Sequence, residues 1–161
     1  MTRVILIALL GILPMSPDGQ GQAPATDRDQ VIAAVQGFFD AMATRDPALA
    51  ARVLMTDGRL YSTREQDGKP VVRSQAFEAF IAGLSKGTSK QLERMWDPEV
   101  KIHGPIATLW TRYDFYTDGK FSHCGIDAFN LVKTPEGWKV AGGAYTVERT
   151  NCPPSPLGPP K

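Results

Sequence analysis

The sequence has few of the residues on which metal and phosphate sites depend. Its 161 residues include two histidines and two cysteines, and they form no His-x-x-x-His motif and no closely spaced cysteine pair. A structural zinc site therefore has no ligands at a suitable spacing. A glycine-rich phosphate loop is also missing, because Gly142-Gly143 lies inside a predicted strand. We predict no metal and no cofactor.

The sequence also lacks an excess of charge of either sign. Eighteen basic and 17 acidic side chains leave a formal net charge of +1. A nucleic-acid partner therefore has no electrostatic support. The chain is long enough for one domain with one hydrophobic core.

One apolar run stands out, and it lies at the N-terminus. Arg3 precedes apolar residues 4–13, and small residues, proline and glycine follow up to Ala23. This layout is typical of a secretory signal peptide, and the run is too short to span a bilayer. We predict a signal peptide over residues 1–23 and an exported domain over residues 24–150, periplasmic or secreted, with no membrane contact after cleavage. A short uncleaved amphiphilic start is the alternative.

Cys124 and Cys152 are the two cysteines. In an oxidising compartment such a pair is more often bridged than free, and closing this loop stabilises a fold by about 3.5 kcal/mol in the chain-entropy model. We predict a disulfide, with a buried free thiol at Cys124 as the alternative. The proline-rich residues 151–161 are predicted to form a disordered tail.

The remaining pattern predicts an α+β domain with three N-terminal helices. The first helix follows a capping box at residues 26–29, the second begins at Asp46-Pro47, and the third carries inward apolar residues over 77–84. Short strands are expected at 59–65, 92–96 and 100–103. Residues 106–148 then form a three-stranded meander, with turns at 118–119 and 134–137.

The Asp118-Gly119 turn suggests a register for the first hairpin of this meander. A two-residue turn pairs Thr117 with Lys120, Asp114 with His123, Trp110 with Asp127 and Thr108 with Phe129. One face of the sheet then carries Trp110, Arg112, Asp114, His123, Asp127, Phe129, Leu131, Trp138, Val140 and Ala144. A slip of one residue exchanges the two faces, and long sheets of this kind often contain bulges.

The opposite face of the predicted sheet is also apolar. It carries Tyr113, Phe115, Ile126 and Tyr145, which is too much apolar surface to leave in water. We therefore predict a homodimer that forms through this outer face.

Two segments, YDFYTDGKFSHCGIDAF and EGWKVAGGAYTVE, resemble the nuclear transport factor 2-like superfamily. Within it, they are most similar to exported bacterial members of the lumazine-binding or polyketide-cyclase-like type, over residues 27–148. The resemblance implies a cone, in which a curved antiparallel sheet wraps around three N-terminal helices and leaves a pocket. It also implies dimerisation through the outer sheet face. Some members are isomerases, dehydratases or cyclases, whereas others only bind or scaffold.

A pocket of this kind predicts a small, flat, largely apolar ligand. The expected ligand contacts are Phe39, Tyr61, Trp110, Arg112 and Phe129. For such aromatic residues, a plain role in the core is the alternative.

Acid/base chemistry would depend on Asp114, His123 and Asp127. Here the alternatives are a surface Asp114–His123 ion pair and an Asp127 that merely holds a loop. Our first hypothesis is thus a binding domain, the second an isomerase, dehydratase or cyclase, and the third an interaction module whose cone is filled.

Overall fold

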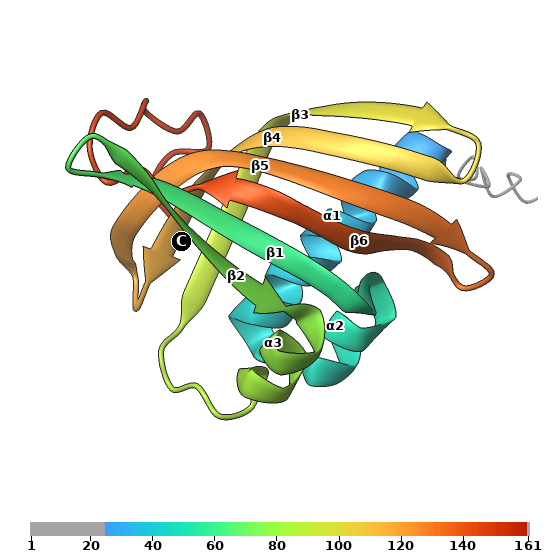
Figure 1. Ribbon diagram of the computed structural model, residues 1–161. Helices are drawn as coiled ribbons and strands as arrows, with labels where there is room; N and C mark the ends of the chain where they lie inside the picture. The colour runs from blue at the N-terminus through green and yellow to red at the C-terminus, as the bar shows by residue number, and fades with distance from the viewer. Residues whose placement is uncertain (1–24, 161) are drawn as a thin grey trace, which may run out of the picture.

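The computed structural model describes residues 25–160, in which three helices lie under one face of a curved sheet (Figure 1). The helices are α1 (Asp27–Thr44), α2 (Pro47–Val53) and α3 (Phe77–Leu84). The strands are β1 (Leu54–Gln66), β2 (Lys69–Ala76), β3 (Gln91–His103), β4 (Ile106–Thr117), β5 (Lys120–Thr134) and β6 (Gly137–Thr146). The predicted α+β class, with three helices and a curved sheet, is confirmed.

The first two helices begin where their capping residues predict. Thr26 and Asp29 form the expected capping box, which satisfies backbone N–H groups at the start of α1. The Asp46 carboxylate accepts hydrogen bonds from two backbone N–H groups of α2, and Pro47 occupies the first turn. Residues of α1 at helical spacing are buried against the sheet.

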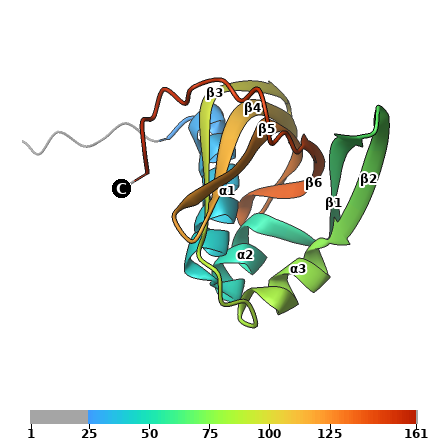
Figure 2. The same cartoon turned by 90° about the vertical axis from the view of Figure 1, so that its left-hand side faces the viewer.

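The six strands are arranged in the order β2-β1-β6-β5-β4-β3. The β1 and β6 strands are parallel and all other neighbours are antiparallel. Figure 2 shows the sheet curving around the helices, with the β1–β2 hairpin and β3 at its two edges. The segments 92–96 and 100–103, predicted as two strands, belong to the single strand β3, which bulges between Trp96 and Glu99.

A bulge in β5 changes the predicted register of the β4–β5 hairpin. Thr117 pairs with Lys120 as expected, but Ser122 is an extra residue, so Phe115 faces His123 and Asp114 faces Cys124. The predicted Asp114–His123 pair is therefore wrong. One inserted residue shifts the β4 partner of every β5 residue from His123 onwards by one position. Because side chains alternate along a strand, this shift also exchanges the faces.

The same shift overturns the other predicted pairs. Asp127 lies opposite Thr111 and Phe129 lies opposite Leu109, so the predicted Trp110–Asp127 and Thr108–Phe129 pairs are wrong. A second bulge leaves Ala141 as the extra residue of β6. It exchanges the positions predicted for Ala144 and Tyr145.

The two bulges decide which side chains face the helices. Tyr113, Phe115 and Tyr145, predicted on the outer face, lie on the inner face of the sheet. Three of the four residues from which we predicted the dimer are therefore not available on the outside. Trp110 and Arg112 occupy the outer face instead.

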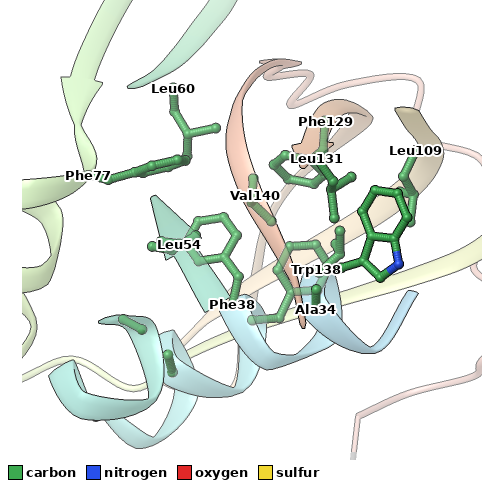
Figure 3. Close-up of a cluster of buried hydrophobic side chains, with 14 of the residues drawn as sticks. Ala34, Phe38, Leu54, Leu60, Phe77, Leu109, Phe129, Leu131, Trp138 and Val140 are labelled. Atoms are coloured by element: carbon green, nitrogen blue, oxygen red, sulfur yellow. The ribbon is translucent and has the colours of Figure 1, made fainter. Parts of the chain in front are cut away.

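The core forms between α1 and the inner face of the sheet (Figure 3). Phe38 of α1 packs among Leu54, Phe129 and Val140, all of them buried. The N-terminus of α1 is also attached to the sheet by polar contacts, because Asp27 accepts hydrogen bonds from Trp138 Nε1 at 3.2 Å and Lys133 Nζ at 2.7 Å.

The C-terminal segment is attached to the outer face of β5. Cys124 and Cys152 form the predicted disulfide, and Glu148 exchanges two backbone hydrogen bonds with Cys124. The segment predicted as a disordered tail therefore contains a residue bonded to the sheet. The predicted signal peptide lies outside the described residues, and over residues 25–160 no helix is long and apolar enough to cross a membrane.

Candidate functional site

The candidate site is a cavity of about 330 Å³ between α1, α3 and the inner face of the sheet. All six strands contribute to its lining, so the cone is open rather than filled. The lining residues are Phe38, Met42, Arg45, Leu60, Gln75, Phe80, Gly83, Leu84, Gly87, Ser89, Gln91, Glu93, Tyr113, Phe115, His123, Asp127, Phe129 and Tyr145.

Phenylalanine rings form the wall of the cavity next to the core. Phe38 meets Phe80 and Phe129 edge to face, with ring centroids 5.3 Å and 6.0 Å apart. These residues come from α1, α3 and β5, so three separate elements fix the shape of the wall. Such edge-to-face contacts stabilise aromatic clusters beyond the burial of their area.

Two acidic side chains, Glu93 and Asp127, face one another at the sheet side of the cavity. Asp127 of β5 is 1% exposed, and its Oδ2 atom has no hydrogen-bond donor among the described residues. Glu93 of β3 reaches across β4, so that a proton on either carboxyl forms a hydrogen bond between the two. A buried charge without a partner is costly, so the pair favours the uptake of a proton.

The electrostatics of the pair follow from this burial. Burial raises the pKa of Asp127 to about 7, although its hydrogen bond with Glu93 acts in the opposite direction. Burial and the negative charge of Asp127 raise the pKa of Glu93 well above its usual range. Because the pKa values of both groups are raised, the two carboxyls hold at least one proton between them near neutrality and can both donate and accept a hydrogen bond.

Two tyrosines flank the carboxyl pair. The Tyr113 hydroxyl donates to the carbonyl of Thr146 at 2.6 Å, and burial strongly raises its pKa. Its ring passes over Gly125, where a Cβ would collide with it and with the Thr146 carbonyl. Tyr145 is half-buried, and burial also raises its pKa. Both phenols therefore remain neutral hydrogen-bonding groups.

His123 lies nearer the β4–β5 turn. Its ring stacks on Phe115 with centroids 4.8 Å apart, meets Tyr113 edge to face, and lies 3.0 Å from the Ser122 hydroxyl through Nδ1. Burial lowers its pKa, and the positive charge of Arg149 acts in the same direction. Asp114 does not lie beside the ring, because it faces Cys124 and not His123.

The structure brings three of the predicted site residues together in the cavity: His123, Asp127 and Phe129. Asp114 lies on the outer face, where Arg94 binds its two oxygens at 2.9 and 2.6 Å. The predicted role of Asp114 in acid/base chemistry is therefore wrong, because the sheet separates it from the cavity.

Four of the five predicted ligand contacts also lie elsewhere. Trp110 and Tyr61, both about half exposed, lie on the outer face together with Arg112. Phe39 is buried in the core beside Phe129 and does not line the cavity. The cause for Trp110 and Arg112 is the Ser122 bulge, which exchanges the faces of β4.

Sequence reasoning missed Glu93 and assigned Tyr113 and Tyr145 to the wrong face. Glu93 lies two residues before Met95, which packs against the core, so the two side chains share the inner face of β3. This alternation could have placed Glu93 on the inner face from the sequence. No local signal, by contrast, could bring Glu93 next to Asp127, because the two residues lie on strands that are not neighbours. Over residues 25–160, no group of three or more His, Cys, Asp or Glu side chains could hold a metal ion.

Solved structures with the same fold are nuclear transport factor 2-like proteins. One from Cytophaga hutchinsonii has a TM-score of 0.62 at 16% identity, covering 76% of this chain and 99% of that one. A protein from Streptomyces avermitilis described as a "putative dehydratase" has a TM-score of 0.57 at 18% identity, covering 75% and 95%. One from Salmonella enterica has a TM-score of 0.59 at 12% identity, covering 78% and 94%. These identities support the fold alone.

A family model assigns the chain to one family within this superfamily. Residues 26–146 match the family described as "Putative lumazine-binding", so the chain belongs to that family within the nuclear transport factor 2-like superfamily. None of the curated proteins matches the sequence. Fold and family together favour a ligand-binding domain.

Proposed function

We propose that the protein binds a small, flat, largely apolar molecule in its cavity, with one polar end of the ligand at Glu93 and Asp127. The observation that carries this proposal is the cavity of about 330 Å³ with phenylalanine walls and a carboxyl pair, of which Asp127 is buried and Glu93 is half-buried. Ligand sites are typically concave and mostly apolar, with a few convergent polar groups. Glu93 and Asp127 both line the cavity, so their carboxyls can accept from a ligand N–H or O–H group.

A cavity-filling variant tests this proposal. Gly83 of α3 lines the cavity, and a Cβ at this position would meet nothing within 4 Å. Gly83→Leu should therefore narrow the cavity where α3 lines it, without a clash at the added Cβ. Ala82→Leu, on the exposed neighbouring position, is the matched control.

The measurement is a thermal-shift screen of the protein from residue 24 onwards against flat aromatic and steroid-like compounds. Compounds that bind only the native state raise the unfolding midpoint by mass action. We expect hits for the unchanged protein and for Ala82→Leu, and loss of those shifts in Gly83→Leu. Hits that survive in Gly83→Leu would place the binding site outside the cavity.

The second candidate is an enzyme that moves a proton on a polarised C–H or C–O bond. The observation that favours it is Asp127, whose pKa of about 7 suits a general acid or base at neutral pH. Glu93 would exchange the proton with Asp127, and neutral His123 would serve as an additional base. The word "dehydratase" in the description of the Streptomyces avermitilis structure is consistent with this class.

Deuterium incorporation separates binding from catalysis. A bound compound with an acidic C–H group is incubated in heavy water and followed by NMR. An enzyme would accelerate the exchange. The Asp127→Asn variant would then show no acceleration, whereas the His123→Ala variant would keep part of it. A binding domain would show no acceleration in any of these proteins.

We also propose that the domain acts outside the cytoplasm. The Cys124–Cys152 disulfide supports this location, since such bonds persist in oxidising compartments. N-terminal sequencing of protein recovered from the periplasm and the medium tests it, with cleavage after Ala23 as the expected result. An intact Met1 in that material would contradict it.

We further propose a homodimer, but through a different set of outer-face residues from the predicted one. Tyr61, Ala144, Ala128 and Trp110 lie side by side across four neighbouring strands, as a flat strip on the outer face. Tyr61 is 47% and Trp110 53% exposed, and apolar strips of this kind favour association. Light scattering should show a dimer for the unchanged protein and a monomer for Trp110→Lys. A monomeric unchanged protein would contradict the proposal.

A further inference from the structure

The carboxyl pair places negative charge at the sheet side of the cavity, and no salt bridge of the described residues reaches either carboxyl. Asp127 and Glu93 are the acidic lining residues, and the charges that act on Glu93 are those of Asp127 and, from across the sheet, Asp114. All of these charges have the same sign. Without a ligand, the pair reduces its repulsion by holding a proton.

The basic groups near the cavity are already engaged or uncharged. Arg94, on the strand that carries Glu93, is bound to Asp114 on the outer face. Arg45 lines the cavity at the end of α1 and keeps its charge, but its guanidinium donates to the carbonyl of Gly87 at 2.8 Å and its charge is not among those that act on Glu93 or Asp127. Burial lowers the pKa of His123, and so does the charge of Arg149, which leaves the imidazole neutral.

The remaining groups that face the pair carry no positive charge either. Tyr113 and Tyr145, from β4 and β6, are neutral phenols, and Glu148 adds a further negative charge near Tyr113. Gln91 and Gln75 are neutral polar residues of the lining. A cation would therefore be the complementary group at this site.

Aromatic side chains surround the place where such a cation would lie. Tyr113, Phe115 and Tyr145 line the cavity from β4 and β6, and Phe38, Phe80 and Phe129 line it next to the core. The faces of aromatic rings attract cations, and this attraction grows when the cation is removed from water. A carboxylate pair inside an aromatic enclosure is thus suited to an organic ammonium group rather than to a hydrated metal ion.

We infer that the cavity takes an arylalkylamine, a flat aromatic body with a protonated alkylamine group, and that this ammonium group lies on the Glu93 and Asp127 carboxyls. This inference rests on the proposed ligand-binding function and specifies the chemical class of the ligand. The ammonium group donates to the carboxyls of Glu93 and Asp127, both of which line the cavity. The aromatic body then occupies the space beside Phe38, Phe80 and Phe129.

Binding of this kind exchanges a proton for the ligand. Above the pKa of Asp127, the pair holds one proton when the cavity has no ligand, and an ammonium group favours ionisation of both carboxyls. The proton therefore leaves to solvent as the amine enters, and the net charge of the site does not change. A neutral ligand of the same shape does not release it.

Three indoles with the same flat body and different charges test this inference. Tryptamine is a cation near neutral pH, tryptophol is neutral and indole-3-acetate is an anion. At about pH 8, calorimetry should show tryptamine binding at least about tenfold more tightly than tryptophol, a factor that cation–π and charge pairing readily supply. Indole-3-acetate should bind most weakly. Titration in buffers with different ionisation enthalpies should show release of up to about one proton with tryptamine and none with tryptophol.

Two charge-neutralising variants assign the effect to the carboxyl pair. Glu93→Gln and Asp127→Asn should each reduce the preference for tryptamine over tryptophol and change the number of protons released, because each variant removes one titratable carboxyl. Glu99→Gln, on an exposed position of the same strand, should change neither. Having two independent variants keeps the test usable if one of them fails to fold.

The outcomes separate this inference from the proposed function. Tryptophol binding as tightly as tryptamine, or tryptamine binding without proton release, would overturn the amine specificity and leave a ligand-binding cavity. Failure of all three indoles to bind the unchanged protein, together with an empty thermal-shift screen, would overturn both. A tryptamine preference that persists in both carboxyl variants would also contradict the inference.

Discussion

At the scale of single residues, the buried carboxyl of Asp127 links the stability of the fold to pH. In an unfolded chain an aspartate titrates near 3.8, whereas folded Asp127 keeps its proton up to about pH 7. Between these values the folded state binds more protons than the unfolded state. The free energy of unfolding therefore falls as the pH rises from about 4 to about 7, and it stays low above that range.

Asp127→Asn should remove much of this pH dependence. The unchanged protein loses stability as the pH rises, whereas the variant does not, because its amide has no proton to lose. We therefore expect the difference in unfolding free energy between the two proteins to grow by about 2–4 kcal/mol, in favour of the variant, from about pH 5 to about pH 8. Urea unfolding at both pH values measures the difference. Glu99→Gln is the control, and parallel pH profiles for the unchanged protein and Asp127→Asn would contradict the expectation.

Arg94 and Asp114 form an ion pair that is protected from solvent, with side chains 15% and 4% exposed. Arg94→Ala would leave the Asp114 carboxylate buried and unpaired, so we expect a loss of about 3–5 kcal/mol. The exposed Lys133–Asp27 pair provides the contrast, with both side chains about two-fifths exposed. Lys133→Ala should change the urea midpoint little, because solvent screens this pair. Similar losses in both variants would indicate that burial does not distinguish the two ion pairs.

At the scale of elements, β5 depends on Gly125 for its approach to Tyr113. A Cβ at this position would collide with the Thr146 carbonyl and the Tyr113 ring, which are held together by the Tyr113 hydrogen bond. We expect Gly125→Ala to destabilise the fold by about 2 kcal/mol or more, since a packed core does not absorb overpacking easily.

The matched control for Gly125→Ala is another glycine-to-alanine change, in α3. At Gly83 an added methyl group meets no atom within 4 Å. Gly83→Ala should therefore be more stable by up to about 1 kcal/mol, because alanine is the better helix former. Thermal unfolding of both variants measures the contrast, and equal stability of the two would argue against close packing at Gly125.

At the scale of the whole molecule, the disulfide joins the C-terminal segment to β5. Reduction should lower stability by about 3.5 kcal/mol and the unfolding midpoint by roughly 7–14 °C, since the unfolded chain regains the entropy of the opened loop. Calorimetry with and without reductant measures this shift. Cys152→Ser should show the lower midpoint in both conditions. A midpoint insensitive to reductant in the unchanged protein would mean that the bond contributes nothing to stability.

The sequence by itself determined the features that have local causes. The capping box at Thr26 and the Asp46-Pro47 start fix the first residues of α1 and α2, since a backbone donor and its cap lie within three residues of one another. The Asp118-Gly119 turn is likewise encoded locally, because both residues adopt the positive φ that a two-residue hairpin loop requires. The α+β class and the cysteine pairing also followed from pattern and count.

Only the tertiary structure decided which residues form the site. The bulges at Ser122 and Ala141 each insert one residue, and with a side-chain period of two one residue is enough to exchange inner and outer faces. Such bulges accommodate the curvature of a whole sheet around its helices, and the nearby sequence does not determine that curvature. The pairing of Glu93 with Asp127 has the same origin, because a third strand separates the strands that carry them and only the folded sheet brings the two carboxyls together.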